Sequence, residues 1–277
     1  MLFLEILKAI ILGIVEGITE WLPVSSTGHM ILVDELMSLD VSDKFMELFL
    51  VVIQLGAICA VPVLFFGKLN PFSSKKSVAE RRSTWLLWSK VVVGVIPAAV
   101  IGVLLDDILE EHLYNYVTVA IALIVFGVAF ILVERFKKDK TNRVERVEEL
   151  SFTDALMIGG FQVLSLIPGT SRSGSTILGG RLIGVSRSAS AEFSFFMAIP
   201  VMLGASLLKI VKFVYEGYTA TGIEISLLLV GLVVSFLVSL VAIRFLTDFV
   251  KRHTFTPFGI YRIALGALVL GYFLITK

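Results

Sequence analysis

The sequence is poor in cysteine, histidine and charge. Its 277 residues include one cysteine and three histidines, and only 17% are Asp, Glu, Lys or Arg. A single cysteine excludes an intramolecular disulfide, and we expect Cys59, which lies in an apolar run, to be a buried and inert thiol. No cysteine and histidine cluster has the spacing of a zinc site. A formal net charge of +1 gives no electrostatic basis for binding nucleic acid.

Signatures of nucleotide-driven chemistry are missing as well. The chain has no GxxxxGK[ST] phosphate loop, which excludes an ATP-driven machine of that type. It also has no aspartate-based phosphoenzyme motif. The first apolar run carries Glu16 and has neither a basic leader nor a small-residue cleavage site, so we expect no cleavable signal peptide.

Hydrophobic residues are in excess, at 57% of the chain. Several apolar runs approach or exceed the ~18 residues that a membrane-spanning helix needs. We therefore predict an all-α polytopic membrane protein that forms a single integral membrane domain over residues 1–277. Six transmembrane helices are expected at residues 45–66, 88–105, 117–134, 190–211, 223–246 and 257–276.

Two further apolar stretches, residues 5–40 and 152–186, are each interrupted by polar residues with Gly and Pro. Irregular backbone survives at membrane depth only where protein or a watery cavity satisfies its polar groups. We predict that each stretch is a re-entrant helical hairpin, which enters and leaves the membrane on one side. The first polar segment, residues 16–29, reads EGITEWLPVSSTGH, and the second polar segment, residues 168–174, reads PGTSRSG.

Loop charges indicate the sides of the membrane. Segments 67–90 and 135–149 each contain six Lys or Arg, whereas segment 106–116 contains four acidic residues and no Lys or Arg. The positive-inside rule places the first two segments in the cytoplasm and the third outside. Both termini are then expected outside, with the first hairpin entering from outside and the second from the cytoplasm. Arg181 and Arg187, near the cytoplasmic end, fit ordinary loop charges.

The two halves of the chain, about 1–140 and 141–277, resemble each other. PVSSTG begins at residue 23, and its counterpart PGTSRSG begins 145 residues later. Each half is expected to hold one hairpin and three spans, and because three is odd, the halves lie inverted in the membrane. Inverted repeats place binding sites where broken helices face each other. We therefore expect the two polar segments to converge on one site.

Glu16 and Glu20 lie one helical turn apart on the same face, roughly 6 Å from each other. At an effective dielectric constant near 20, two such charges repel by about 3 kcal/mol. We expect a compensating cation, either a divalent metal ion bound by Glu16 and Glu20 or the guanidinium of Arg172. Protonation of one carboxylate is the other way to relieve the repulsion. Gly13 and Gly17 on the same helix have the GxxxG spacing of close helix packing.

The end of the first polar segment supplies hydroxyl groups, flexible backbone and an imidazole. These groups belong to Ser25, Ser26, Thr27, Gly28 and His29. A Pro/Gly turn with exposed amides can form an anion-binding nest. Serine is a candidate nucleophile and histidine a candidate general acid or base.

Arg172 is the central residue of the second polar segment. A guanidinium stays charged, and its planar fork matches phosphate oxygens. The apolar residues on both sides of the segment predict that it is buried. The expected phosphate-binding residues are Ser25, Thr27, Gly28, Gln162, Thr170, Ser171, Arg172, Ser173 and Gly174.

The two polar segments closely resemble those of the undecaprenyl-diphosphatase family, also called bacitracin-resistance proteins. The resemblance extends over essentially the whole chain and includes VIQLGAI (52–58), EFSF (192–195) and PFGIYR (257–262). It implies hydrolysis of undecaprenyl diphosphate to undecaprenyl phosphate and inorganic phosphate, which recycles the lipid carrier of peptidoglycan synthesis and confers bacitracin tolerance. It also implies a divalent cation, Mg²⁺ or Ca²⁺, and a site that opens to the outer side of the bacterial plasma membrane.

The resemblance assigns Glu16 and Glu20 as the acidic pair, Ser26 and His29 as active-site residues and Arg172 as the phosphate clamp. The chemistry of these residues makes Glu20, Ser26, His29 and Arg172 the catalytic candidates. Ser26 is the expected nucleophile, with His29 or Glu20 relaying its proton. Attack by a metal-activated water, without a phosphoserine, is the competing mechanism, and the sequence does not choose between them.

The expected partners are a polyprenyl diphosphate and membrane lipid, not nucleic acid, and a homodimer is left open. The alternative function is a flippase or transporter of polyprenyl phosphate or another anion, because secondary transporters share inverted repeats and broken helices. An anion carrier needs Arg172 and backbone amides. It does not need paired acids together with Ser26 and His29, and this favours hydrolysis.

Overall fold

The structure, a computed structural model, describes residues 2–137 and 141–276, except for the side chains of Asp34, Asp106, Asp107 and Glu110. The predicted loop charges of Asp106, Asp107, Glu110, Lys138 and Lys140 therefore lie outside the described residues. Two 3-10 turns are η1 (Val147–Glu149) and η2 (Val163–Leu166). The α-helices are α1 (Leu2–Thr19), α2 (Ser26–Met37), α3 (Asp43–Leu64), α4 (Phe66–Leu69), α5 (Val78–Leu113), α6 (Tyr116–Phe136), α7 (Phe152–Gln162), α8 (Arg172–Leu182), α9 (Arg187–Tyr215), α10 (Gly222–Arg252) and α11 (Thr256–Thr276).

Six helices in the described part of the chain are long and apolar enough to cross a membrane: α3, the first 28 residues of α5, α6, α9, α10 and α11. This confirms the predicted all-α polytopic membrane protein. Most spans begin near the predicted residue, but α5 begins earlier, at Val78. A capping box causes the early start: Ser77 Oγ accepts from the Glu80 N–H at 3.2 Å, and Glu80 Oε2 accepts from the Ser77 N–H at 2.7 Å.

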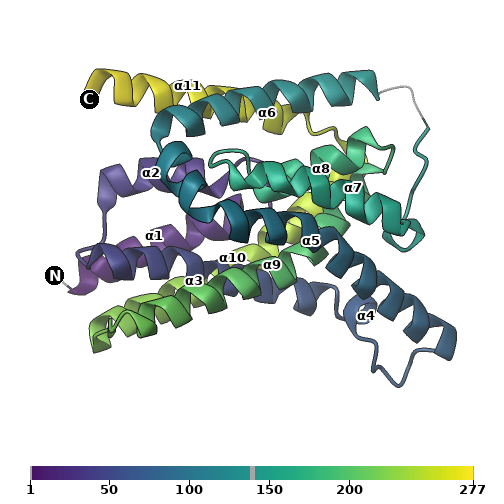
Figure 1. Ribbon diagram of the computed structural model, residues 1–277, viewed down its shortest axis with the longest axis horizontal. Coiled ribbons are helices and arrows are strands. Elements are labelled where there is room, and N and C mark those ends of the chain that lie inside the picture. The colour runs from purple at the N-terminus through teal and green to yellow at the C-terminus, as the bar shows by residue number, and fades with distance from the viewer. Residues whose placement is uncertain (1, 138–140, 277) are drawn as a thin grey trace.

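Each interrupted stretch forms two helices joined by a turn (Figure 1). The hairpin of α1 and α2 begins and ends at the end of the molecule where α11 also finishes. The hairpin of α7 and α8 begins and ends at the opposite end, so the two turns approach each other from opposite directions. Entry of these hairpins into a membrane from opposite sides, and the inverted repeat itself, stay predictions.

Small residues bring the hairpins close to the spans. α1 packs against α10, and α7 packs against α5. A Cβ atom at Gly13 would lie 2.8 Å from Gly231 O, and one at Gly17 would lie 2.8 Å from Ser235 O. The predicted close packing at the GxxxG pair is therefore confirmed. A Cβ atom at Gly159 of α7 would likewise lie too close to the backbone of α5. The first helix of each hairpin therefore packs closely on a span from the other half of the chain.

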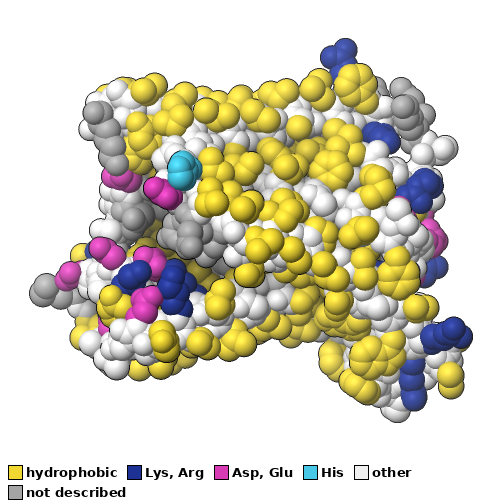
Figure 2. Space-filling model, in the orientation of Figure 1, with side chains coloured by type: hydrophobic (Ala, Val, Ile, Leu, Met, Phe, Trp, Pro, Cys, Tyr) yellow, Lys and Arg dark blue, Asp and Glu magenta, His cyan; other side chains and the backbone are white. Residues whose placement is uncertain are grey.

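Hydrophobic side chains cover most of the face shown in Figure 2, and Lys and Arg side chains line the right-hand end, where the loop before α5 lies. Cys59 is exposed on α3, so the prediction of a buried thiol is wrong. An apolar run does not distinguish buried residues from lipid-facing ones, because lipid is as apolar as a protein core. A membrane span therefore carries apolar side chains on its outer face as well.

The interpretation of Arg181 as an ordinary loop charge is also wrong. Its side chain is 4% exposed, and its Nε donates to Glu134 Oε1 at 3.0 Å. Arg187 Nε donates to Glu134 Oε2 at 2.7 Å. Glu134 belongs to α6, far from both arginines in sequence, so local charge patterns could not reveal the pairing.

Candidate functional site

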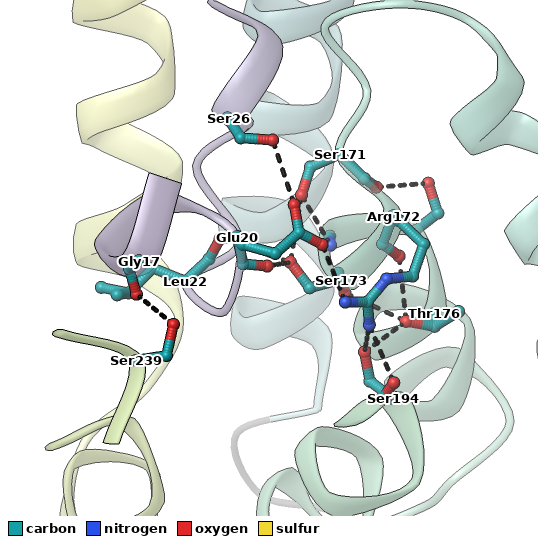
Figure 3. A network of polar contacts seen from close by, with 12 residues as sticks. Gly17, Glu20, Leu22, Ser26, Ser171, Arg172, Ser173, Thr176, Ser194 and Ser239 are labelled. Atoms are coloured by element: carbon teal, nitrogen blue, oxygen red, sulfur yellow. Dashed lines mark hydrogen bonds and ion pairs between the residues drawn. The ribbon is translucent and has the colours of Figure 1, made fainter. Parts of the chain in front are cut away.

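The two polar segments meet inside the bundle (Figure 3). Arg172 Nη2 donates to Glu20 Oε1 at 2.9 Å, across 152 residues of sequence. Arg172 Nη1 donates to Ser194 O at 2.8 Å and to Ser194 Oγ at 3.2 Å. Both charged side chains are nearly buried, with Arg172 10% and Glu20 6% exposed. The expected convergence of the segments is confirmed, and Ser194 is a contact that the sequence interpretation missed.

A serine in the left-handed conformation precedes the second helix of each hairpin. Ser25 has φ 72° and Ser171 has φ 74°, and no other non-glycine residue in the described part has a positive φ. Each serine caps its helix: Ser25 Oγ accepts from the Gly28 N–H at 3.3 Å, and Ser171 Oγ accepts from the Gly174 N–H at 3.1 Å. Such a conformation costs of order 1–3 kcal/mol and concentrates at functional sites.

The helices α2 and α8 therefore both begin at the site. The first N–H groups of a helix have no partner within it and carry the positive end of the helix dipole, which favours an anion. Gly28 and Gly174 already use their N–H groups for the serine caps. The amides at the very start of each helix, at residues 26–27 and 172–173, are the ones left by helix geometry for a phosphate group.

Glu20 joins the first hydroxyl of α2 to the guanidinium of α8. Ser26 Oγ donates to Glu20 Oε2 at 3.1 Å, while Arg172 occupies Oε1. The Arg172 guanidinium also lies over the Trp21 ring, 5.7 Å from its centroid. One carboxylate oxygen is thus fixed by a cation, and the other is placed to take the proton of Ser26.

Two serines of the second polar segment bind protein groups. Ser173 Oγ lies 3.1 Å from Glu20 O and 3.3 Å from Leu22 O, and both carbonyls accept from it. Ser171 Oγ lies 3.1 Å from Ser173 Oγ. Both were expected to bind phosphate; in the structure, Ser173 ties the second segment directly to the backbone of the first.

Both ring nitrogens of His29 lie within hydrogen-bond distance of groups other than Ser26. Nδ1 lies 2.7 Å from Ser25 O, and Nε2 lies 2.6 Å from Tyr261 Oη. Of the two proton relays left open by the sequence, Glu20 is the one that is hydrogen-bonded to Ser26. Tyr261 was not predicted as a site residue, although it belongs to PFGIYR.

Arg262 is another site residue that the sequence interpretation missed. It is fully buried. Its Nη1 donates to Pro23 O at 3.2 Å, and its Nη2 donates to Gly169 O and to Thr170 O at 2.9 Å each. The signal was present: Arg262 is the only charged residue of the apolar run 257–276, and a charge inside a span usually has a function. It holds the backbones of both polar segments together.

Most buried polar atoms without a hydrogen-bond partner belong to the two polar segments or to residues named with them above. Nine such side-chain atoms occur in the described part of the chain, and seven belong to the polar segments, Gln162 or Arg262. The seven are Glu16 Oε1, Trp21 Nε1, both amide atoms of Gln162, Thr170 Oγ1, Arg172 Nε and Arg262 Nε. Buried polar groups normally bind protein, water or a ligand, so this concentration marks a place where a ligand or ordered water belongs.

The exposed residues indicate how a ligand reaches the site. Thr27 is exposed and Ser26 and His29 are half-buried, whereas Glu20 is buried. Tyr261 is 46% exposed. The open side of the site is therefore the start of α2 and the part of α11 beside it.

The acidic pair, Glu16 and Glu20, has donor atoms of the kind that bind a divalent cation. No cluster of three or more His, Cys, Asp or Glu side chains that could enclose a metal ion is found among the described residues. Glu16, however, is buried, and its Oε1 has no hydrogen-bond partner. Mg²⁺ is usually bound by one or two carboxylates with substrate phosphates and water. Glu16 and Glu20 match that donor set.

The starts of two hairpin helices and a buried guanidinium meet inside a helical bundle, an arrangement that favours a phosphate-like anion. The fold and this arrangement indicate the class: a polytopic membrane protein whose site suits a phosphate group. Within this class the sequence comparison is specific. Residues 9–268 match the family described as bacitracin resistance protein BacA, and the chain belongs to this family.

Three relatives named undecaprenyl-diphosphatase are similar to the chain over nearly its full length. The protein from Enterococcus faecalis is 57% identical over 274 residues, which cover 99% of each chain. The protein from Lactiplantibacillus plantarum is 56% identical over 270 residues, 98% of each chain. The protein from Acetivibrio thermocellus is 56% identical over 274 residues, 99% of this chain and 100% of its own. The resemblance inferred from the two polar segments is thus confirmed.

Proposed function

We propose that this protein hydrolyses undecaprenyl diphosphate to undecaprenyl phosphate and inorganic phosphate, and that it thereby recycles the lipid carrier and raises tolerance to bacitracin. Membership of the family and the name of the relatives support this reaction. The observation that carries the proposal in this chain is the hydrogen-bonded row from Ser26 through Glu20 to Arg172. It aligns a nucleophile, a proton acceptor and a fixed cation at the starts of two helices.

The first step is attack by Ser26 Oγ on the terminal phosphorus atom. The serine proton passes to Glu20 Oε2, 3.1 Å away. The bond from this phosphorus to the bridging oxygen breaks, and undecaprenyl phosphate leaves with the electron pair. Phosphoryl transfer depends mainly on positioning and on stabilisation of charge, which Arg172 and the amides at the helix starts supply.

The second step is hydrolysis of the phosphoserine. Water attacks the phosphorus atom, the bond to Ser26 Oγ breaks, and Glu20 returns its proton to the serine oxygen. Inorganic phosphate keeps the oxygen and the protons of the water. A divalent cation, Mg²⁺ or Ca²⁺, held by Glu16 and Glu20 would neutralise part of the diphosphate charge.

The site is proposed to open to the outer side of the bacterial plasma membrane. Basic residues of segment 67–90 lie at one end of the molecule, and the hairpin of α1 and α2 starts and finishes at the other. The positive-inside rule then puts the basic end in the cytoplasm and both termini outside. Tags at either terminus should be cleaved by an external protease in cells with a permeabilised outer envelope and an intact plasma membrane; protected tags would reverse the orientation.

We also propose that residues 1–140 and 141–277 form an inverted repeat within one membrane domain, with re-entrant hairpins. Paired contacts support this: α1 packs on α10 as α7 packs on α5, and Ser25 and Ser171 form equivalent left-handed caps. A homodimer stays a prediction, which chemical cross-linking in membranes would test.

Purified protein in detergent micelles provides the decisive assay. Micelles have no compartments, so release of phosphate from a polyprenyl diphosphate establishes hydrolysis, whereas a flippase or anion carrier would release none. Rapid acid quenching followed by mass spectrometry of the peptide that contains Ser26 tests the mechanism. Phosphate on Ser26 is expected; full turnover without it, by wild type and by Ser26→Ala, would instead support a water nucleophile.

A further inference from the structure

The two ring nitrogens of His29 have partners of different kinds. Nδ1 lies 2.7 Å from Ser25 O, a carbonyl oxygen that can only accept a hydrogen bond. Nδ1 must therefore carry the proton, and in the neutral ring Nε2 holds the lone pair. Nε2 lies 2.6 Å from Tyr261 Oη, so the tyrosine hydroxyl is the donor of that bond. The two partners together select one tautomer of His29.

Tyr261 is held opposite His29 by the residue next to it. Arg262 fixes this part of α11 to the backbone carbonyls of Pro23, Gly169 and Thr170. The Tyr261 and His29 rings stack nearly parallel, with centroids 5.5 Å apart and an interplanar angle of 9°. The Tyr261 hydroxyl is therefore held at Nε2 by a part of α11 that is hydrogen-bonded to both polar segments.

We propose that Tyr261 is a positioning residue for His29, which it holds in one orientation and one tautomer at the open side of the site. This inference rests on the proposed hydrolysis and deepens it. The two proposed steps pass the serine proton through Glu20, so His29 acts here as a fixed neutral group one helical turn from Ser26, and the Ser25 carbonyl alone leaves the Nε2 edge of its ring unrestrained. Tyr261 supplies the missing restraint, and its effect on the reaction passes through His29.

The test is Tyr261→Phe, which keeps the stacked ring and removes the hydroxyl. Tyr272→Phe is the matched control, because it makes the same change on the same helix at a ring that packs edge-on against Phe273. Loss of one neutral hydrogen bond predicts a fall in kcat of about three- to tenfold for Tyr261→Phe. KM should be unchanged, and Tyr272→Phe should turn over as wild type does.

A double-mutant cycle with His29→Ala tests whether the effect passes through His29. If it does, Tyr261→Phe has no further effect on phosphate release in the His29→Ala background, because the group that it positions is gone. Wild-type kcat in Tyr261→Phe, or losses that multiply in the double variant, would overturn the proposal.

A spectroscopic measurement separates this inference from the proposed reaction. The chain has three histidines, so the ¹⁵N spectrum of histidine-labelled protein in micelles is simple, and the resonances lost in His29→Ala identify His29. Wild type should show the Nδ1–H tautomer and Tyr261→Phe a mixture of tautomers. An unchanged His29 spectrum in Tyr261→Phe would refute the positioning role, even in an active enzyme. Absence of phosphate release from wild type would instead refute the proposed reaction, whatever the spectrum shows.

Discussion

Replacement of Arg172 by lysine tests the centre of the proposed site. The guanidinium reaches in two directions, to Glu20 Oε1 at 2.9 Å and to Ser194 O at 2.8 Å. A lysine ammonium is a point charge without this fork, so Arg172→Lys keeps the charge and loses the geometry. Removal of one donor aimed at charge in a transition state lowers kcat by about 10²–10³-fold, or about 2.7–4 kcal/mol. We expect a loss in that range.

Arg172→Ala and a matched double variant distinguish an effect on stability from an effect on catalysis. It leaves Glu20, which is 6% exposed, without its cation, and breaking a buried pair in this way destabilises a protein by about 3–5 kcal/mol. The double variant Arg172→Ala/Glu20→Gln removes both charges. It should recover much of the lost stability while remaining inactive. Thermal unfolding and phosphate release, measured on the same micelle preparations, distinguish the two effects.

Arg187→Lys is the control for this series. Arg187 also pairs with a buried acid, Glu134, but it does so at the far end of α8 from the site. The Arg187→Lys variant should hydrolyse substrate at the wild-type rate. Wild-type kcat in Arg172→Lys would contradict the proposed role of Arg172, because the two-directional guanidinium would then be dispensable.

Three further predictions concern the cation, the backbone clamp and the helix contact. Excess EDTA should abolish phosphate release and added Mg²⁺ should restore it; undiminished turnover in EDTA would remove the cation from the proposal. Arg262→Gln should lower the free energy of unfolding by about 3 kcal/mol or more, since three bonds from a charged group to buried carbonyls are lost; an unchanged Tm would contradict the clamp. Gly17→Val should lower Tm because its side chain meets Ser235 O on α10, whereas Gly160→Ala, where an added Cβ meets open space, should have little effect.

The sequence predicted those features of the fold and the site that a strong physical constraint determines. Two acids in an apolar stretch predicted a compensating cation or a bound proton, and Arg172 was one of the two cations expected, so its contact with Glu20 could be anticipated. The six spans followed from the length and hydrophobicity of the runs. Both inferences depend on the high cost of unpaired charge in lipid.

The detailed contacts could not be predicted because they depend on backbone geometry. Ser26 follows a left-handed turn at Ser25 that no residue pattern specified, and its partner is Glu20 rather than His29. Tyr261 reaches His29 across 232 residues, and only the packing of α11 beside α2 brings them together. Arg262 was visible as a lone charge, but its partners are backbone carbonyls, which leave no mark in a sequence.

The bond from Arg262 to the Pro23 carbonyl spans 239 residues, and it has a consequence for biogenesis. The site cannot be completed when the hairpin of α1 and α2 enters the membrane, because Arg262 is synthesised 239 residues after Pro23. A nascent protein should stay inert until α11 is inserted, which prevents a half-made chain from acting on the lipid carrier.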